Sequence, residues 1–160
     1  MARFIVLKGD PNSGKTYTMW MVYHMLSHLL KDISFKHEFK LRKGSWYFSY
    51  EPNPTAFFND HDATDFMAKF SVKDLRVGMI SEGDEAIPLE NKINEFLYEG
   101  MDVIICCVRA RNTKKSSFRM FLTKFANSYQ HIFVDLNKGP GNSVSKMNQM
   151  SAALKIINFI

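Results

Sequence analysis

A glycine-rich segment near the start of the chain carries residue types that bind phosphate. It matches the pattern G-x-x-x-x-G-K-[ST] at every fixed position, and its residues are Gly9, Asp10, Pro11, Asn12, Ser13, Gly14, Lys15 and Thr16. The backbone N–H groups of such a loop, with the positive end of a following helix, form a nest for phosphate oxygens. Lys15 adds a charge that can reach the β- and γ-phosphates, and the Thr16 hydroxyl is placed to ligate Mg²⁺. We therefore expect a nucleoside triphosphate or diphosphate to contact residues 9–17, Tyr17 included.

The elements on either side of this loop are those that the pattern needs. Residues 3–8 form a short apolar run that predicts a buried strand. Residues 17–31 repeat apolar side chains at helical spacing, which predicts a helix directly after the loop. A strand, a glycine-rich turn and a helix in this order distinguish a phosphate loop from a chance match.

The motif and its context resemble the P-loop NTPase superfamily, in which this segment is the Walker A motif. The resemblance rests on residues 9–16 and implies a parallel sheet flanked by helices, with nucleotide at the carboxyl ends of the strands and Mg²⁺ as cofactor. It implies no particular reaction, because kinases, ATPases, GTPases and motors share these features.

A second candidate feature is a pair of acids after a predicted strand. The apolar run from Val77 is followed by Ser81, Glu82, Gly83 and Asp84. Carboxylates at the carboxyl end of a strand lie where ligands bind in an open α/β sheet. In the usual Walker B pattern the acid directly follows the apolar residues, but here Ser81 intervenes. Glu82 and Asp84 both remain candidate catalytic acids, with Asp84 and Thr16 as the predicted metal pair; the alternative is a solvated acidic turn that starts the next helix.

A third candidate feature is basic. The segment 109–119 follows another apolar strand and contains Arg109, Arg111, Lys114, Lys115 and Arg119. A guanidinium near a bound triphosphate could stabilise charge on the transferring phosphoryl group or clamp a second, phosphorylated or polyanionic ligand. We expect the catalytic role at Arg109, which directly ends its strand, with Arg111 and Arg119 next. An ordinary exposed basic loop is an equally good interpretation.

The alternation of strands and helices predicts one α/β domain covering residues 1–160. We expect a three-layer, doubly wound, mainly parallel sheet of five strands with helices on both faces. The expected strands are residues 3–8, 45–50, 76–81, 102–108 and 131–135, and the expected helices are residues 17–31, 88–98, 116–128 and 143–157. A hairpin or an extended excursion that leads into the strand 45–50 is expected at residues 33–41, and a short helix with its loop within residues 53–71. The resemblance to the nucleotide-kinase branch of the superfamily implies the strand order 2-3-1-4-5.

Composition limits the class of protein. Hydrophobic residues make up 46% of the 160 residues, enough for a packed core. No apolar run approaches the ~20 residues that span a bilayer, so we expect no membrane segment. Cys106 and Cys107 are adjacent, which disfavours a disulfide and suggests a reducing cytoplasm. A net charge of +5 suits anionic ligands and leaves nucleic acid as an open partner.

The sequence gives only a default prediction for the base of the bound nucleotide. Asn137 and Lys138 resemble the start of a GTPase base-recognition motif, but Pro140 stands where its aspartate would be. Guanine is therefore unsupported, and ATP with Mg²⁺ is the expected ligand.

Three functions fit these features. We rank a small Mg²⁺-dependent ATPase first, followed closely by a kinase for a nucleotide or small metabolite, with a non-catalytic, nucleotide-gated binding module behind them. The layout, with S-x-G-D after one strand and V-R-x-R at the end of the next, also resembles small ATP-binding proteins of bacteria or their phages. That resemblance supplies no reaction.

Overall fold

The structure, a computed structural model, describes residues 1–10, 13–29, 37–41, 47–49, 65–136 and 146–160. Along the chain the elements are β1 (Arg3–Gly9), α1 (Lys15–Leu29), β2 (His37–Leu41), β3 (Tyr47–Ser49), β4 (Phe66–Val72), β5 (Leu75–Ile80), α2 (Ala86–Tyr98), β6 (Val103–Arg109), α3 (Ser117–Lys124), β7 (Gln130–Asp135) and α4 (Lys146–Phe159).

The described strands form one seven-stranded sheet in the order β3-β2-β4-β5-β6-β1-β7. β5, β6, β1 and β7 are parallel neighbours, whereas β4 pairs antiparallel with β5, and β2 pairs antiparallel with both β4 and β3. The α/β class is therefore confirmed, and the sheet is parallel over β5, β6, β1 and β7. The predicted five strands and their order need correction, because β6 lies between β1 and β5, and β2 and β4 extend the sheet.

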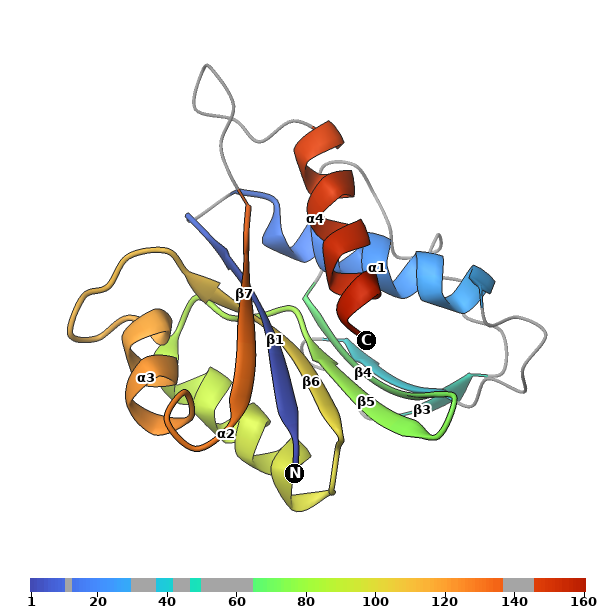
Figure 1. The fold of residues 1–160 in the computed structure, drawn as a ribbon, viewed down its shortest axis with the longest axis horizontal. Helices are drawn as coiled ribbons and strands as arrows, with labels where there is room; N and C mark the ends of the chain where they lie inside the picture. Colours follow the sequence, from blue (N-terminus) through green and yellow to red (C-terminus); the bar gives the residue numbers. More distant parts are fainter. Residues whose placement is uncertain (11–12, 30–36, 42–46, 50–64, 137–145) are drawn as a thin grey trace.

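Helices cover both faces of the sheet, as expected for three layers (Figure 1). α1 and α4 pack on one face, where Trp20, Tyr23 and Ile156 join the buried side chains of the strands. α2 and α3 pack on the other face through residues such as Phe96 and Phe121. Each face thus has its own apolar core, and the sheet separates them.

Residues 66–72 form a strand, so the expectation of a short helix is wrong for this part of residues 53–71. Residues 53–64 lie outside the described residues. β5 follows β4 after a tight turn in which Lys73 has a φ of 54°. In the segment FMAKFSV, Phe66, Ala68 and Phe70 face one core and Met67 faces the other, which is the two-residue period of a strand. A sheet partner on either side, β5 and β2, decides the conformation of this segment.

β6 is a buried central strand, as its uniformly apolar sequence predicts. Cys106 contributes to one core and Cys107 to the other, so the adjacent thiols point to opposite faces. Both cysteines are free. Burial raises the pKa of Cys106 to about 12 and raises that of Cys107 well above its ordinary value. These thiols are packing groups that remain protonated at neutral pH.

Candidate phosphate-binding site

The glycine-rich loop (residues 9–16) joins β1 to α1, as predicted. β1 ends at Gly9 and α1 begins at Lys15, so the helix N-terminus opens directly onto the loop. Gly14 has a φ of 85°, which favours glycine because other residues are strained there. The Gly14 carbonyl accepts the Thr18 N–H at 2.9 Å and starts the helical hydrogen bonding. Pro11 and Asn12 lie outside the described residues.

The loop lacks a side chain at Gly9 and, among the described residues, has an unpaired hydroxyl at Ser13, and both features suit the close approach of a polar ligand. A Cβ on Gly9 would lie 2.5 Å from Ser13 Oγ and 3.3 Å from Lys15 Cγ, so only glycine leaves this space. The Ser13 hydroxyl is buried, and within the described part of the chain it has no hydrogen-bond partner. A buried hydroxyl without a partner is costly, and a phosphate oxygen would be a suitable acceptor for it.

Lys15 is a buried cation at the centre of the loop, with only 6% of its surface exposed. Its Nζ donates to the carbonyl oxygens of Gly9 at 3.2 Å and Asp10 at 2.8 Å. It also forms an ion pair with Asp84 Oδ1 at 3.1 Å. These contacts hold the Lys15 ammonium at the loop, where it can bind an anion.

Asp84 reaches Lys15 although β6 separates β5 from β1. The reason is the path of the chain after β5: a Cβ on Gly83 would lie 1.8 Å from the carbonyl oxygen of Cys107, so the loop lies directly against the backbone of β6. Glu85 then forms a β-bridge with Ser116, which fixes the loop on its far side. Because residue 83 has no Cβ, the loop can pass close to the end of β6 and bring Asp84 to Lys15.

Arg109 completes the group from the end of β6. It lies beside Gly9 in the parallel register of β1 and β6, and Ala110 N–H donates to the Gly9 carbonyl at 2.9 Å. The Arg109 backbone N–H donates to Ser117 Oγ at 2.9 Å, and this hydrogen bond connects the end of β6 to α3. The Arg109 Nε lies 3.6 Å from Asp84 Oδ1. One carboxylate oxygen thus lies within reach of two cations.

Thr16 pairs with an acid that the sequence analysis missed. Its hydroxyl donates to Asp65 Oδ1 at 2.7 Å, and Ser81 Oγ donates to the same oxygen at 3.1 Å. Ser81 Oγ in turn accepts the Phe66 N–H at 2.7 Å. Asp65 directly precedes β4, which runs antiparallel to β5 and so begins at the edge where the parallel strands end.

Aromatic packing fixes Asp65 in this place. Trp20 of α1 stacks on Phe66 with ring centroids 4.2 Å apart, and Tyr23 lies against Phe66 and Phe70. Each such contact contributes about 0.5–1.5 kcal/mol beyond simple burial. Since Thr16 and Trp20 share one helix, this packing brings the start of β4 to the first turn of α1. The available sequence signal was Asp65 before the run Phe66-Met67, an acid at a strand edge.

Glu82 and Asp84 are separated by the structure. The Glu82 carboxylate pairs with Lys92 Nζ of α2 at 2.9 Å, whereas Asp84 faces Lys15 and Arg109. Of the two candidate acids, Asp84 is the one brought to the loop. Its ion-pair partners are cations, and the acid beside Thr16 is Asp65, so the predicted metal pair of Thr16 and Asp84 is not what the geometry brings together.

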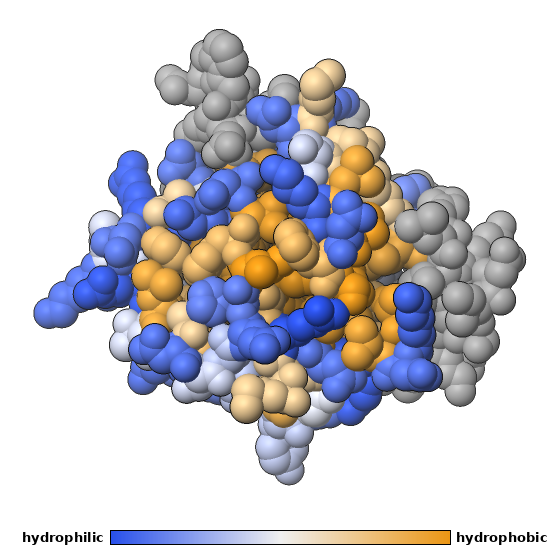
Figure 2. Space-filling view, viewed as in Figure 1, coloured by the Kyte–Doolittle hydropathy of each residue, from blue (hydrophilic) through white to orange (hydrophobic). Residues whose placement is uncertain are grey.

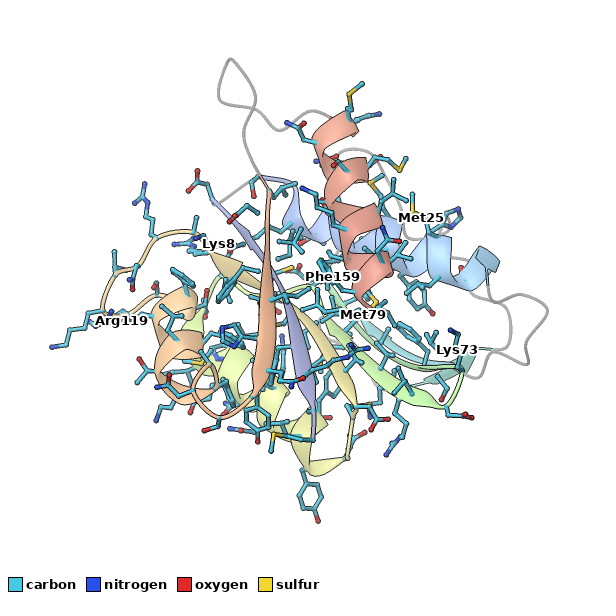
Figure 3. All side chains as sticks on the ribbon, in the orientation of Figure 1. Lys8, Met25, Lys73, Met79, Arg119 and Phe159 are labelled. Carbon is cyan, nitrogen blue, oxygen red and sulfur yellow. The ribbon has the colours of Figure 1, made fainter. Side chains whose placement is uncertain are left out.

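The cations of the basic segment, residues 109–119, also lie in two places. Arg109 lies at the site, but Arg111, Lys114 and Lys115 are exposed on the loop before α3. Arg119 is also exposed, and its Nη1 donates to Asn112 Oδ1 of this loop at 3.5 Å, beside α3 at the outer edge of the molecule (Figure 3). Hydrophilic residues project from this side of the molecule, whereas apolar residues gather nearer the middle of the same face (Figure 2). Arg111 and Arg119 thus belong to an outer basic surface that adjoins the site through Arg109.

The described residues contain no cluster of three or more histidine, cysteine or acidic side chains able to hold a metal. Mg²⁺ at phosphate sites commonly needs only one or two protein ligands, the rest being phosphate oxygens and water. The Thr16 hydroxyl and the Asp65 carboxylate are ligand types of that kind.

Comparison with protein families, with curated proteins and with solved structures finds no match to this chain. Within the described residues, no helix combines the length and apolar character needed to cross a bilayer.

Proposed function

We propose that this chain is a Mg²⁺-dependent ATP-binding protein of the P-loop NTPase type and that it hydrolyses ATP. The observation that carries the proposal is the pairing of the two adjacent motif residues with different acids. Lys15 Nζ contacts Asp84 at 3.1 Å, and Thr16 Oγ1 contacts Asp65 at 2.7 Å. The cation that we assign to phosphate and the hydroxyl that we assign to Mg²⁺ are adjacent at the start of α1, and each contacts its own carboxylate.

In this proposal, different residues of the site bind the phosphates and the metal. The loop N–H groups, the Ser13 hydroxyl and Lys15 bind phosphate oxygens. Thr16 and Asp65 would hold Mg²⁺, Thr16 directly and Asp65 directly or through water; the ion would neutralise phosphate charge and help to orient the triphosphate. Arg109 supplies a second cation where negative charge builds up during phosphoryl transfer. The two buried, unbridged thiols suit a cytoplasmic protein.

Turnover of ATP tests the reaction. Purified protein should release inorganic phosphate from ATP with Mg²⁺ and should lose this activity in EDTA. The Lys15→Ala variant, prepared in parallel, controls for a contaminating ATPase. Phosphate release that is equal in the two preparations would show that the chain does not hydrolyse ATP.

A kinase is the second candidate, because an exposed basic surface lies next to Arg109. Arg111, Lys114, Lys115 and Arg119 could bind a phosphorylated or polyanionic second ligand beside the nucleotide. A panel of nucleotides and phosphorylated metabolites, added with ATP and Mg²⁺, separates the two reactions: a kinase makes ADP with a phosphorylated acceptor, and an ATPase makes ADP with free phosphate. For a kinase, Arg111→Ala or Arg119→Ala should raise the KM of the acceptor more than that of ATP.

A further inference from the structure

Asp84 is an anion between two cations at the place where the proposed function needs a phosphate. One carboxylate oxygen, Oδ1, lies 3.1 Å from Lys15 Nζ and 3.6 Å from Arg109 Nε. In a nucleotide complex the same lysine must contact the β- and γ-phosphates. The carboxylate and a phosphate oxygen cannot both occupy this position, and their like charges repel at such short range.

We propose that, in the nucleotide-free protein, the Asp84 carboxylate holds the place of the terminal phosphate, and that triphosphate binding exchanges one anion for the other. This inference rests on the proposed function and deepens it. Asp84 then acts as an internal competitor for the phosphate site, and Arg109 becomes the second cation that contacts the terminal phosphate.

Differences in burial favour an exchange in which Asp84 moves and Lys15 stays. The Lys15 side chain is 7% exposed and is held by two backbone carbonyls, whereas the Asp84 side chain is 46% exposed. A buried ammonium that loses its counter-ion is costly, but a half-exposed carboxylate can turn into water at little cost. The backbone of the preceding residue, Gly83, lies tightly against the Cys107 carbonyl, so the exchange moves the Asp84 side chain and leaves this backbone in place.

The exchange affects triphosphates and diphosphates differently. A diphosphate bound at the loop can use Lys15 and the helix N-terminus without reaching the position of Asp84 Oδ1, so the carboxylate can stay beside Arg109. A triphosphate must displace it. Asp84 therefore lowers the affinity for ATP more than that for ADP, and Arg109 contributes to ATP binding alone.

The test measures the dissociation constants of ATP and ADP by calorimetry in EDTA, where a metal-binding role of Asp84 has no effect. Asp84→Asn removes the competing charge and should tighten ATP binding by about ten-fold, with a clearly smaller change for ADP. Arg109→Gln should weaken ATP binding and leave ADP binding nearly unchanged. Glu90→Gln, which removes the same charge from an ion pair between α2 and Lys124, is the matched control and should change neither constant.

Each outcome decides the inference. Equal or weaker ATP binding by Asp84→Asn, or an equal gain for ATP and ADP, would overturn the exchange while leaving nucleotide binding by the wild type intact. If neither wild type nor Asp84→Asn binds ATP, in EDTA or with Mg²⁺, the proposed function fails and the inference fails with it. Asp84→Ser, checked by circular dichroism, provides a second neutral variant if Asp84→Asn does not fold.

Discussion

The Thr16 hydroxyl donates a 2.7 Å hydrogen bond to the carboxylate of Asp65, a residue 49 positions later in the sequence. The contact joins the first turn of α1 to the residue before β4, and Ser81 at the end of β5 donates to the same carboxylate oxygen. Three elements therefore meet at the acid that we propose as the support for Mg²⁺.

Asp65→Asn should reduce the Mg²⁺ dependence of ATP binding. The amide keeps the size of the side chain but removes the negative charge that favours the metal, and changes of this kind lower metal affinity by roughly ten- to a hundred-fold. Titration of Mg²⁺ at fixed ATP, read by calorimetry, measures the effect. ATP binding in EDTA is the internal control and should remain close to that of the wild type. An unchanged Mg²⁺ titration would remove Asp65 from the metal site.

Lys15→Ala should weaken ATP binding while the protein remains folded. Loss of one charge-assisted contact with phosphate costs on the order of 1.5–3 kcal/mol, or roughly ten- to a hundred-fold in the dissociation constant. Calorimetry measures the affinity, and circular dichroism establishes that the fold is retained. Lys92→Ala, which removes a cation of the same type from α2, is the matched control. Equal ATP affinity in wild type and a folded Lys15→Ala variant would exclude the loop as the nucleotide site.

Local sequence could predict the loop because all of its determinants are close together in the chain. Gly14, Lys15 and Thr16 lie between a strand and a helix that the hydrophobic pattern reveals, and the structure places β1 and α1 within two residues of the predicted bounds. Arg109 could be predicted for the same reason, since it directly ends an apolar strand. The helices on both faces likewise follow from apolar side chains at helical spacing.

Asp65 and the strand order could not be predicted in this way because they depend on which strands become neighbours. β4 pairs with β5 and β2 through backbone hydrogen bonds that leave little trace in the sequence of residues 65–72. The position of β6 between β5 and β1 likewise depends on packing across the whole sheet. In the sequence Ser81 separates Glu82 and Asp84 from the apolar strand, whereas in the structure its hydroxyl donates to the Asp65 carboxylate.

Glu82→Gln should have little effect on ATP affinity or on its Mg²⁺ dependence. In the structure this carboxylate pairs with Lys92 of α2 at 2.9 Å, and the acids at Lys15 and Thr16 are Asp84 and Asp65. Loss of the partly exposed ion pair should lower the free energy of unfolding by no more than about 1 kcal/mol. Calorimetry and urea unfolding measure the two quantities. A loss of Mg²⁺ dependence as large as that of Asp65→Asn would show that Glu82 contributes to the metal site.

The two cysteines should resist thiol reagents in the folded protein. Burial raises the pKa of Cys106 to about 12, and it is also the main cause of the raised pKa of Cys107. The thiolate is the reactive form, so labelling at pH 8 should be slow until denaturant unfolds the chain. The unfolded state releases these protons near pH 9, so the free energy of unfolding should decrease as the pH rises above that value. Rapid labelling of both thiols without denaturant would show that β6 is accessible.

Gly83→Ala should disturb both the fold and the site. Its Cβ would lie 1.8 Å from the Cys107 carbonyl oxygen, a backbone atom that cannot move without displacing the central strand. We expect the free energy of unfolding to fall by about 1–3 kcal/mol, with a lower Tm in thermal unfolding. Because the strained loop also carries Asp84, the ratio of ATP to ADP affinity in EDTA should shift in the same direction as in Asp84→Asn. Ser71→Ala, at an exposed position of β4, is the control, and a Gly83→Ala variant as stable as that control would mean that the loop does not lie tightly against β6.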